Sequence, residues 1–332
     1  MRPFPLALAS IMLLACAPLK ADGPPAAPAT AAAIEERGRW ITLGTRAGPL
    51  ASPVRSQPAN LLVVGGANIL VDVGDGTSGR LAAVGVATAK LDAVFISHLH
   101  WDHTGGLAAI FGLRAQTNST SALRIYGPPG TADMVAGILA SMRPGATAGY
   151  GVAGAKPTDL SALTEVIELR EKATFAYRGM TVSARNNTHY SFAPGSDLNG
   201  RFESLSFRFD LPGRSIVYTG DTGPSTAVEE LAMGADLLIA EMMDVEDTVA
   251  NVRRNNPNMP EPARLAMEKH LREHHLLPTD VGQMATRAKV GGVVVTHFIG
   301  RERGDPAHFE YLRQIAAHYA GPVVIANDLD AF

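Results

Sequence analysis

The sequence has a single cysteine, Cys16, among 332 residues. One cysteine cannot form a disulfide bond within the chain, and it leaves the body of the protein without a thiol nucleophile or thiol metal ligand. Charge is also scarce, since Asp, Glu, Lys and Arg make up only 18% of the residues and the formal net charge is −3. The chain therefore has no basic field to attract nucleic acid, and we do not expect nucleic acid as a partner.

The apolar run at the N-terminus, residues 4–15, is too short to cross a bilayer as a stable helix. It follows Arg2, a pattern typical of a secretory signal. We expect residues 1–21 to be a signal peptide, cleaved near Ala21, or a lipoprotein signal, because the four residues ending at Cys16 resemble a bacterial lipobox. The protein is then expected in the periplasm or secreted. A lipid on Cys16, anchoring it to the outer membrane, would be its only contact with a membrane.

Residues 22–35 are rich in alanine and proline, without periodicity, and are interpreted as a linker. From residue 36 the pattern changes, and with 46% apolar residues in the whole chain there is ample material for a core. No tandem repeat is visible. We expect one domain over residues 36–332.

Apolar runs and helical patterns alternate along this domain. Strands are expected at residues 41–45, 59–64, 68–73, 91–97, 215–219, 235–240 and 292–296. Helices are expected at residues 78–86, 228–233, 279–289 and 306–319. This alternation predicts an α/β fold with two β-rich halves. Polar residues follow several strands directly, and the ends of strands are where α/β folds place active sites.

Four potential metal ligands fall within six residues directly after the expected strand 91–97: His98, His100, Asp102 and His103. Imidazole and carboxylate groups are ligands for zinc and similar ions. Residues two apart on an extended segment point the same way, so His98 and His100 can bind one metal. The following turn can direct Asp102 and His103 at a second. The alternative is a surface loop that is rich in histidine by chance.

The pattern His98-x-His100-x-Asp102-His103 matches the signature of the metallo-β-lactamase superfamily. This resemblance implies an αββα four-layer sandwich, in which two β-sheets are flanked by helices. It also implies two Zn²⁺ ions, although Mn²⁺ or Fe²⁺ suit the same donors. The implied first site comprises His98, His100 and His189, and the implied second site Asp102, His103 and His297, with Asp221 bridging the two. Taken singly, His189 could be a polar loop residue, Asp221 a turn former and His297 a core histidine.

Further segments resemble ribonuclease Z and its relatives, namely residues 43–45, 71–76, 125–130, 237–241 and 296–298. In that branch a glutamate and a histidine upstream of the last ligand assist catalysis, and Glu241 and His275 match them. Two features depart from the branch: residues 276–279 lack its Ser-Thr pair, and the stretch between Glu241 and His275 is longer than usual.

The tRNA-clamping arm of ribonuclease Z has a poor counterpart here, because Lys156 is the only charge in residues 144–157. An exported protein would also not meet precursor tRNA. The sequence is similar to exported bacterial arylsulfatases of this fold, including around residues 56–60 and 242–244. The formylglycine motif of the common sulfatases is absent. The resemblance therefore implies a dinuclear, metal-dependent arylsulfatase acting on a small-molecule ester.

Three side chains are assigned catalytic roles. Asp102 is expected to orient the nucleophile, and His275, steered by Glu241, to donate a proton to the departing oxygen. His274 is the alternative donor, since His275 could be an exposed histidine at a charged helix end. Glu241 could instead only support a metal-binding histidine.

Other functions fit the same ligands: a phosphodiesterase or ribonuclease Z-like nuclease, a lactone or acyl ester hydrolase, or a metal-binding protein without turnover. The ribonuclease Z resemblance also allows a homodimer. Loops at residues 145–163 and 245–272 are expected to shape the pocket, and Tyr150, Tyr190 and Phe298 are candidates to line it. His308 and His318 are interpreted as surface or packing residues.

Overall fold

The computed structural model describes residues 38–154 and 156–332. The predicted signal and linker, with Cys16, lie outside the described residues. Within the described part, no helix is both long and apolar enough to cross a membrane.

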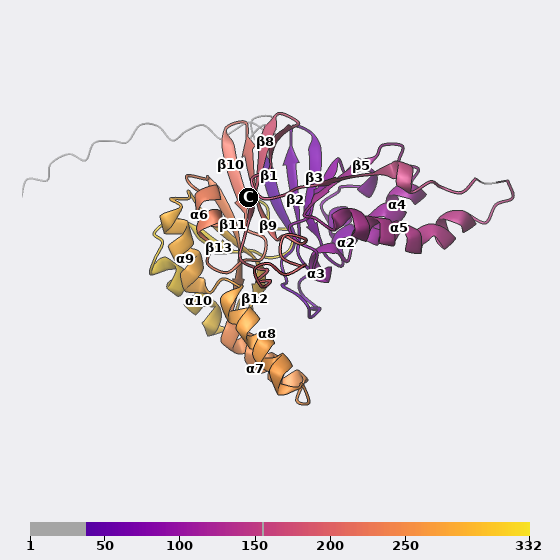
Figure 1. Cartoon of the computed structure of the whole chain (residues 1–332). Helices are drawn as coiled ribbons and strands as arrows, with labels where there is room; N and C mark the ends of the chain where they lie inside the picture. Colours follow the sequence, from indigo (N-terminus) through magenta and orange to yellow (C-terminus); the bar gives the residue numbers. More distant parts are fainter. Residues whose placement is uncertain (1–37, 155) are drawn as a thin grey trace, which may run out of the picture.

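Two β-sheets form the centre of the molecule (Figure 1). The first sheet has the strand order β1-β2-β3-β4-β5-β6, and the second has the order β13-β12-β11-β10-β9-β8-β7. The strands of the first sheet are β1 (Arg39–Gly44), β2 (Ala59–Val64), β3 (Ala67–Val73), β4 (Ala93–Phe95), β5 (Leu123–Gly127) and β6 (Thr164–Glu168). Those of the second are β7 (Thr174–Tyr177), β8 (Met180–Asn186), β9 (Leu205–Leu211), β10 (Arg214–Tyr218), β11 (Leu237–Met243), β12 (Val293–Ile299) and β13 (Val323–Ile325).

Three apolar clusters hold these layers together. The middle cluster joins the facing sides of the sheets, where the Phe95 ring meets the edge of Phe209 at 5.4 Å between centroids. A second cluster packs the first sheet on α2 (Thr77–Ala83), α4 (Leu107–Gln116) and α5 (Thr131–Ala148). The third packs the second sheet on α6 (Thr226–Leu231), α9 (Pro278–Arg287) and α10 (Pro306–Ala316). The predicted αββα sandwich is confirmed, because each sheet is apolar on both faces and carries helices on its outer one.

The predicted strands appear with shifted ends. The expected strand 91–97 is only the three-residue β4, whereas β11 and β12 continue beyond their expected ends. Glu241 and His297 therefore lie within strands rather than after them. The pairing of β11 with β12 shifts next to Glu241, which places His297 opposite no partner, at a φ of 41°. This bulge turns the His297 side chain out of the regular alternation.

The two expected loops are partly helical, which corrects the sequence-based prediction. Residues 145–148 continue α5, with Pro144 inside the helix, and residues 245–272 form most of a helical hairpin. Its helices are α7 (Val245–Asn255) and α8 (Glu261–Glu273), and it projects from the body near β12 (Figure 1). The Asp244 carboxylate accepts a hydrogen bond from the Asp247 amide and begins α7. Few apolar residues mark these helices in the sequence.

The last residues complete the edge of the first sheet. Trp40 and Phe332 exchange two backbone hydrogen bonds of 3.0 and 2.8 Å, and Thr42 bonds in the same way with Asp330 and Leu329. The chain thus returns from β13, in the second sheet, to cover β1, in the first.

Candidate metal centre

The expected ligands converge at one end of the two sheets. His98 and His100 follow β4, Asp102 and His103 lie in the short helix α3 (Trp101–Thr104), and the other three come from the second sheet. Their donor atoms form two groups, each within 4.8 Å: His98, His100 and His189, and Asp102, His103, Asp221 and His297. The structure therefore brings together all the residues that the superfamily signature assigns to the two sites.

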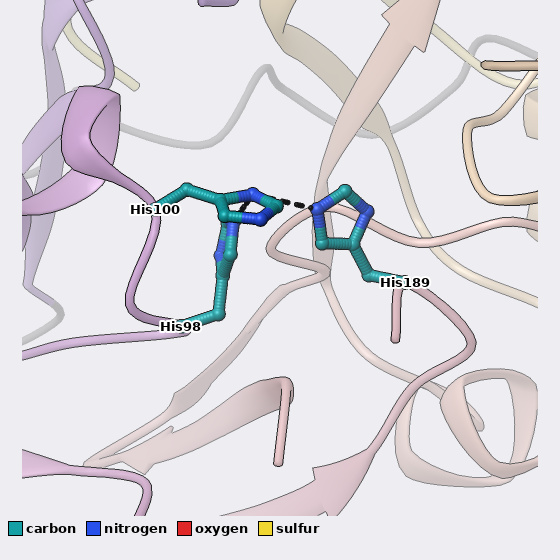
Figure 2. A group of neighbouring side chains, drawn as sticks. All are labelled: His98, His100 and His189. Carbon is teal, nitrogen blue, oxygen red and sulfur yellow. Dashed lines mark hydrogen bonds between the residues drawn. The ribbon is translucent and has the colours of Figure 1, made fainter. Parts of the chain in front are cut away.

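The first group is a histidine triad (Figure 2). Nδ1 of His100 lies 3.0 Å from Nε2 of His98 and 3.1 Å from Nε2 of His189. Burial lowers the pKa of His98 and His189 well below the usual value, so both rings are neutral at physiological pH. Neutral imidazoles that point lone pairs at one place are suited to bind a cation.

The second group centres on Asp221. Its carboxylate oxygens lie 3.2 Å from Nε2 of His103 and 3.1 Å from Nε2 of His297. The same carboxylate is 3.8 Å from Nε2 of both His98 and His189. Asp221 thus lies between the two groups, as a bridging ligand must.

Buried atoms without partners support this assignment. Nε2 of His103, Nε2 of His297 and Oδ1 of Asp221 are buried and make no hydrogen bond to any described residue, although they lie close together. Unpaired buried polar atoms are costly, and a cation bound between them would satisfy all three. The donor set of imidazoles and carboxylates therefore fits two zinc-like ions.

In the second group, the aspartates and the histidines shift one another's pKa values. Burial alone would lower the pKa of His297, but Asp221 and Asp102 raise it to about 10. Burial would raise the pKa of Asp221, yet His103 and His297 hold it well below its usual range. Metal binding at this group must therefore displace protons from histidine.

Asp72, which received no role from the sequence, fixes the ring of His103. It is fully buried at the end of β3, in a left-handed conformation with a φ of 58°. Its carboxylate accepts hydrogen bonds from the Ser97 amide and hydroxyl and from the Tyr218 hydroxyl, each 2.7 Å long, and lies 2.8 Å from Nδ1 of His103. This contact leaves Nε2 of His103 to face Asp221. The sequence signal that could have revealed this role is an aspartate within an otherwise apolar strand.

The contact between Gly48 and Asp102 was also not predicted from the sequence. The Gly48 amide donates a 2.9 Å hydrogen bond to Oδ2 of Asp102, and a side chain at this position would come within 2.3 Å of the same oxygen. Glycine here allows the loop before β2 to pack directly on Asp102.

Glu241 and His275 form a buried pair beside the second group. Nδ1 of His275 lies 2.8 Å from Oε2 of Glu241, whose other oxygen accepts a 2.6 Å hydrogen bond from the Thr222 amide. Burial lowers the pKa of His275, but Glu241 outweighs this effect and raises it. His274 points elsewhere, with its Nδ1 2.6 Å from the Thr188 carbonyl oxygen. The geometry favours His275 over His274 as proton donor.

A pocket of about 820 Å³ opens onto the metal centre and reaches His275. Its walls include Leu50, Trp101 and Met243, and residues of α7 and α8 line one side. Trp101 is 87% exposed, so its ring is available to a bound molecule.

The three aromatic residues expected to line the pocket do not lie in its wall. Phe298 is buried in the cluster beneath α10, and the Tyr190 hydroxyl accepts a hydrogen bond from the Leu99 amide. Tyr150 lies beyond the end of α5, where its hydroxyl donates to the Gln116 carbonyl. His308 is buried and packs against Phe298, and His318 is on the surface, as predicted.

The fold and this constellation together define a metal-dependent hydrolase of the metallo-β-lactamase superfamily. The family model described as anti-Pycsar protein Apyc1 matches residues 44–243. A ribonuclease Z from Mycobacterium avium is 31% identical over 298 residues, which cover 87% of this chain and 96% of that protein. The chain therefore belongs to the Apyc1 family, within the ribonuclease Z-like branch of that superfamily.

Solved structures show the same fold. Human tRNase Z, short form, matches with a TM-score of 0.59 and 24% identity, over 89% of this chain and 98% of that one. A diphosphatase from the PhnP family matches with a TM-score of 0.59 and 18% identity, over 89% of this chain and 97% of that one. At these identities the likeness establishes the architecture only.

Proposed function

We propose that the protein hydrolyses small phosphodiesters that carry an apolar or aromatic group. The observation that carries this proposal is the pocket, which is walled, largely apolar and ends at the metal centre. Arg46 is the only lysine or arginine among its lining residues. One guanidinium suits the single negative charge of a phosphodiester and is too little for the many phosphates of a tRNA.

The relatives support phosphorus rather than sulfur as the reacting atom. A ribonuclease cleaves phosphodiester bonds and a diphosphatase cleaves a phosphoanhydride, and both names occur among the similar proteins. Arg46 lines the pocket, so its guanidinium is the basic group there that can bind a phosphoryl oxygen.

In the proposed reaction, different residues of the site have different roles. Two zinc ions bound by the seven ligands would supply Lewis-acid chemistry, making water a stronger nucleophile and neutralising charge on phosphorus oxygens. Asp102, held by the Gly48 amide, faces the pocket and orients the attacking water. His275 donates a proton from its Nε2 to the departing oxygen, while Glu241 holds its Nδ1.

The test compares initial rates of the zinc-reconstituted full chain on bis(p-nitrophenyl) phosphate, p-nitrophenyl sulfate and p-nitrophenyl acetate. We expect the phosphodiester to be hydrolysed fastest, and the Asp221→Ala variant to lose that rate. A dominant acetate rate would replace the proposal with an acyl ester hydrolase. Full zinc occupancy without any turnover would indicate a metal-binding protein.

Aryl sulfate hydrolysis is the second candidate. A sulfate monoester also carries one negative charge, and the exposed Trp101 ring beside the metal centre would suit its aryl group. A sulfate rate above the phosphodiester rate in the same assay would make this the function.

We further propose that the chain is exported to the periplasm, with or without a lipid on Cys16, and forms a homodimer. Cell fractionation of the wild type and of Cys16→Ala tests the first part, and the mass of the purified protein by light scattering tests the second.

A further inference from the structure

A second histidine cluster lies beside the metal centre. Donor atoms of His189, His270 and His275 lie within 4.8 Å of one another. The His270 ring centroid is 5.0 Å from that of His189 and 5.5 Å from that of His275. His270 is in the last turn of α8, and the proposed hydrolysis assigns it no role.

The free nitrogens in this cluster belong to His270 and His275. Nε2 of His189 faces His100 and Asp221, so it would bind the ion of the first site. Nδ1 of His275 is engaged by Glu241, which leaves Nε2 available. Imidazoles that bind metals commonly donate their other N–H to a carboxylate in this way. The His270 imidazole makes no hydrogen bond to any other described residue, so the ring can turn to present either nitrogen.

His270 is partly exposed and His275 is buried, and both are among the residues that line the pocket. An ion entering the pocket could therefore reach them without any opening of the core. Two imidazoles would leave the other coordination positions of zinc to water, and the ions of the two principal sites would lie close by. Such a position should fill only after the two principal sites.

We propose that His270 and His275 form a third zinc site that fills when zinc exceeds the two principal sites and then inhibits hydrolysis. The bound ion would take Nε2 of His275, the atom that donates the proton, and would fix α8 across the pocket. The binding part stands by itself, and the inhibition part rests on the proposed phosphodiesterase function.

Zinc bound per chain, measured by equilibrium dialysis with elemental analysis, tests the binding part. In excess zinc we expect about three ions per wild-type chain and about two per His270→Gln chain. His318→Gln is the matched control, because His318 is an exposed histidine outside every group that could hold a metal among the described residues. The His318→Gln chain should bind the same number of zinc ions as the wild type. Circular dichroism checks that His270→Gln is folded.

Rates on bis(p-nitrophenyl) phosphate during a zinc titration test the inhibition. The wild type and His318→Gln should lose activity at high zinc, and His270→Gln should keep it. Wild-type binding that ends at two ions, or an unchanged stoichiometry in His270→Gln, would overturn the site. Equal zinc inhibition in all three proteins would overturn its inhibitory role. Without phosphodiester turnover in any of them, the proposed function and inhibition both fall, and the dialysis still decides the site.

Discussion

The sheets and the α7–α8 hairpin are built in different ways. At the ends of the sheets, most of the ligands are buried, with His100 exposed, and His103 is braced by Asp72. The hairpin meets the body through a small cluster that contains Val245 and Val249, and its two helices are joined by exposed ion pairs such as Arg253 with Glu268. Exposed ion pairs add little stability. We infer from this contrast that the chemistry takes place on the rigid part, the sheets, and that the lightly anchored hairpin selects the substrate.

The largest effect is expected from removing the bridging carboxylate of the rigid part. Losing metal-based charge stabilisation costs several kcal/mol, so Asp221→Ala should reduce kcat/KM by about a thousand-fold or more. Asp75→Ala is the control, because Asp75 is an exposed aspartate in another glycine-flanked turn. Steady-state kinetics on a phosphodiester measures both. Activity of Asp221→Ala within tenfold of the wild type would contradict the two-metal site.

His275→Ala should reduce the rate by about a hundred-fold on diesters with a poor alkoxide leaving group. The loss should shrink with p-nitrophenolate, which leaves without a proton donor. His274→Ala, whose ring faces the Thr188 carbonyl, should show no such dependence. A uniform loss across leaving groups would mean that His275 has only a structural role.

Asp72→Asn sharpens the comparison without changing a ligand. An asparagine has one acceptor oxygen, so it cannot accept from the Ser97 amide at Oδ1 and also from the Ser97 hydroxyl, Tyr218 and His103 at Oδ2. Zinc affinity should therefore fall by roughly 10- to 100-fold. Competition with a chromophoric chelator gives the two affinities. Unchanged affinity would show that the His103 ring is held well enough by packing alone.

The smallest effects separate stability from selectivity. Leu238→Ala, fully buried in the second sheet, should lower the free energy of unfolding by about 3 kcal/mol, and Leu271→Ala in α8 by only about 1 kcal/mol. Leu271 also lines the pocket, so its variant should raise KM for bulky diesters while Leu238→Ala leaves KM unchanged. Urea unfolding and steady-state kinetics together test this. A larger loss of stability in Leu271→Ala, with a raised KM in Leu238→Ala, would contradict the separation of stability from substrate selection.

The same contrast explains what could be predicted from the sequence. The four ligands of the compact motif were visible locally, whereas His189, Asp221 and His297 were assigned only through the family resemblance. Seven of the thirteen strands in the described residues were also visible locally, as apolar runs between turns. Their extent was not. Whether β11 continues through Glu241 depends on its pairing with β12, and the bulge at His297 arises from that pairing alone.

The hairpin was missed for the opposite reason. Its helices carry many charges and little continuous apolar pattern, since most of one side faces solvent and the pocket. Residues 245–272 were expected to shape the pocket and do line it, but their helical form was not predicted. Residues 145–163 do not line it, and the aromatic candidates Tyr150, Tyr190 and Phe298 were wrong. The roles of Asp72 and Gly48 come from contacts across long sequence separations, which a single sequence does not display.

The return of residues 329–332 to β1 has a consequence for biosynthesis. Residues 329–332 follow all the other strands of the domain in the sequence, so the edge of β1 that they cover stays bare on the ribosome until those strands have been made. An uncovered edge invites pairing with other chains.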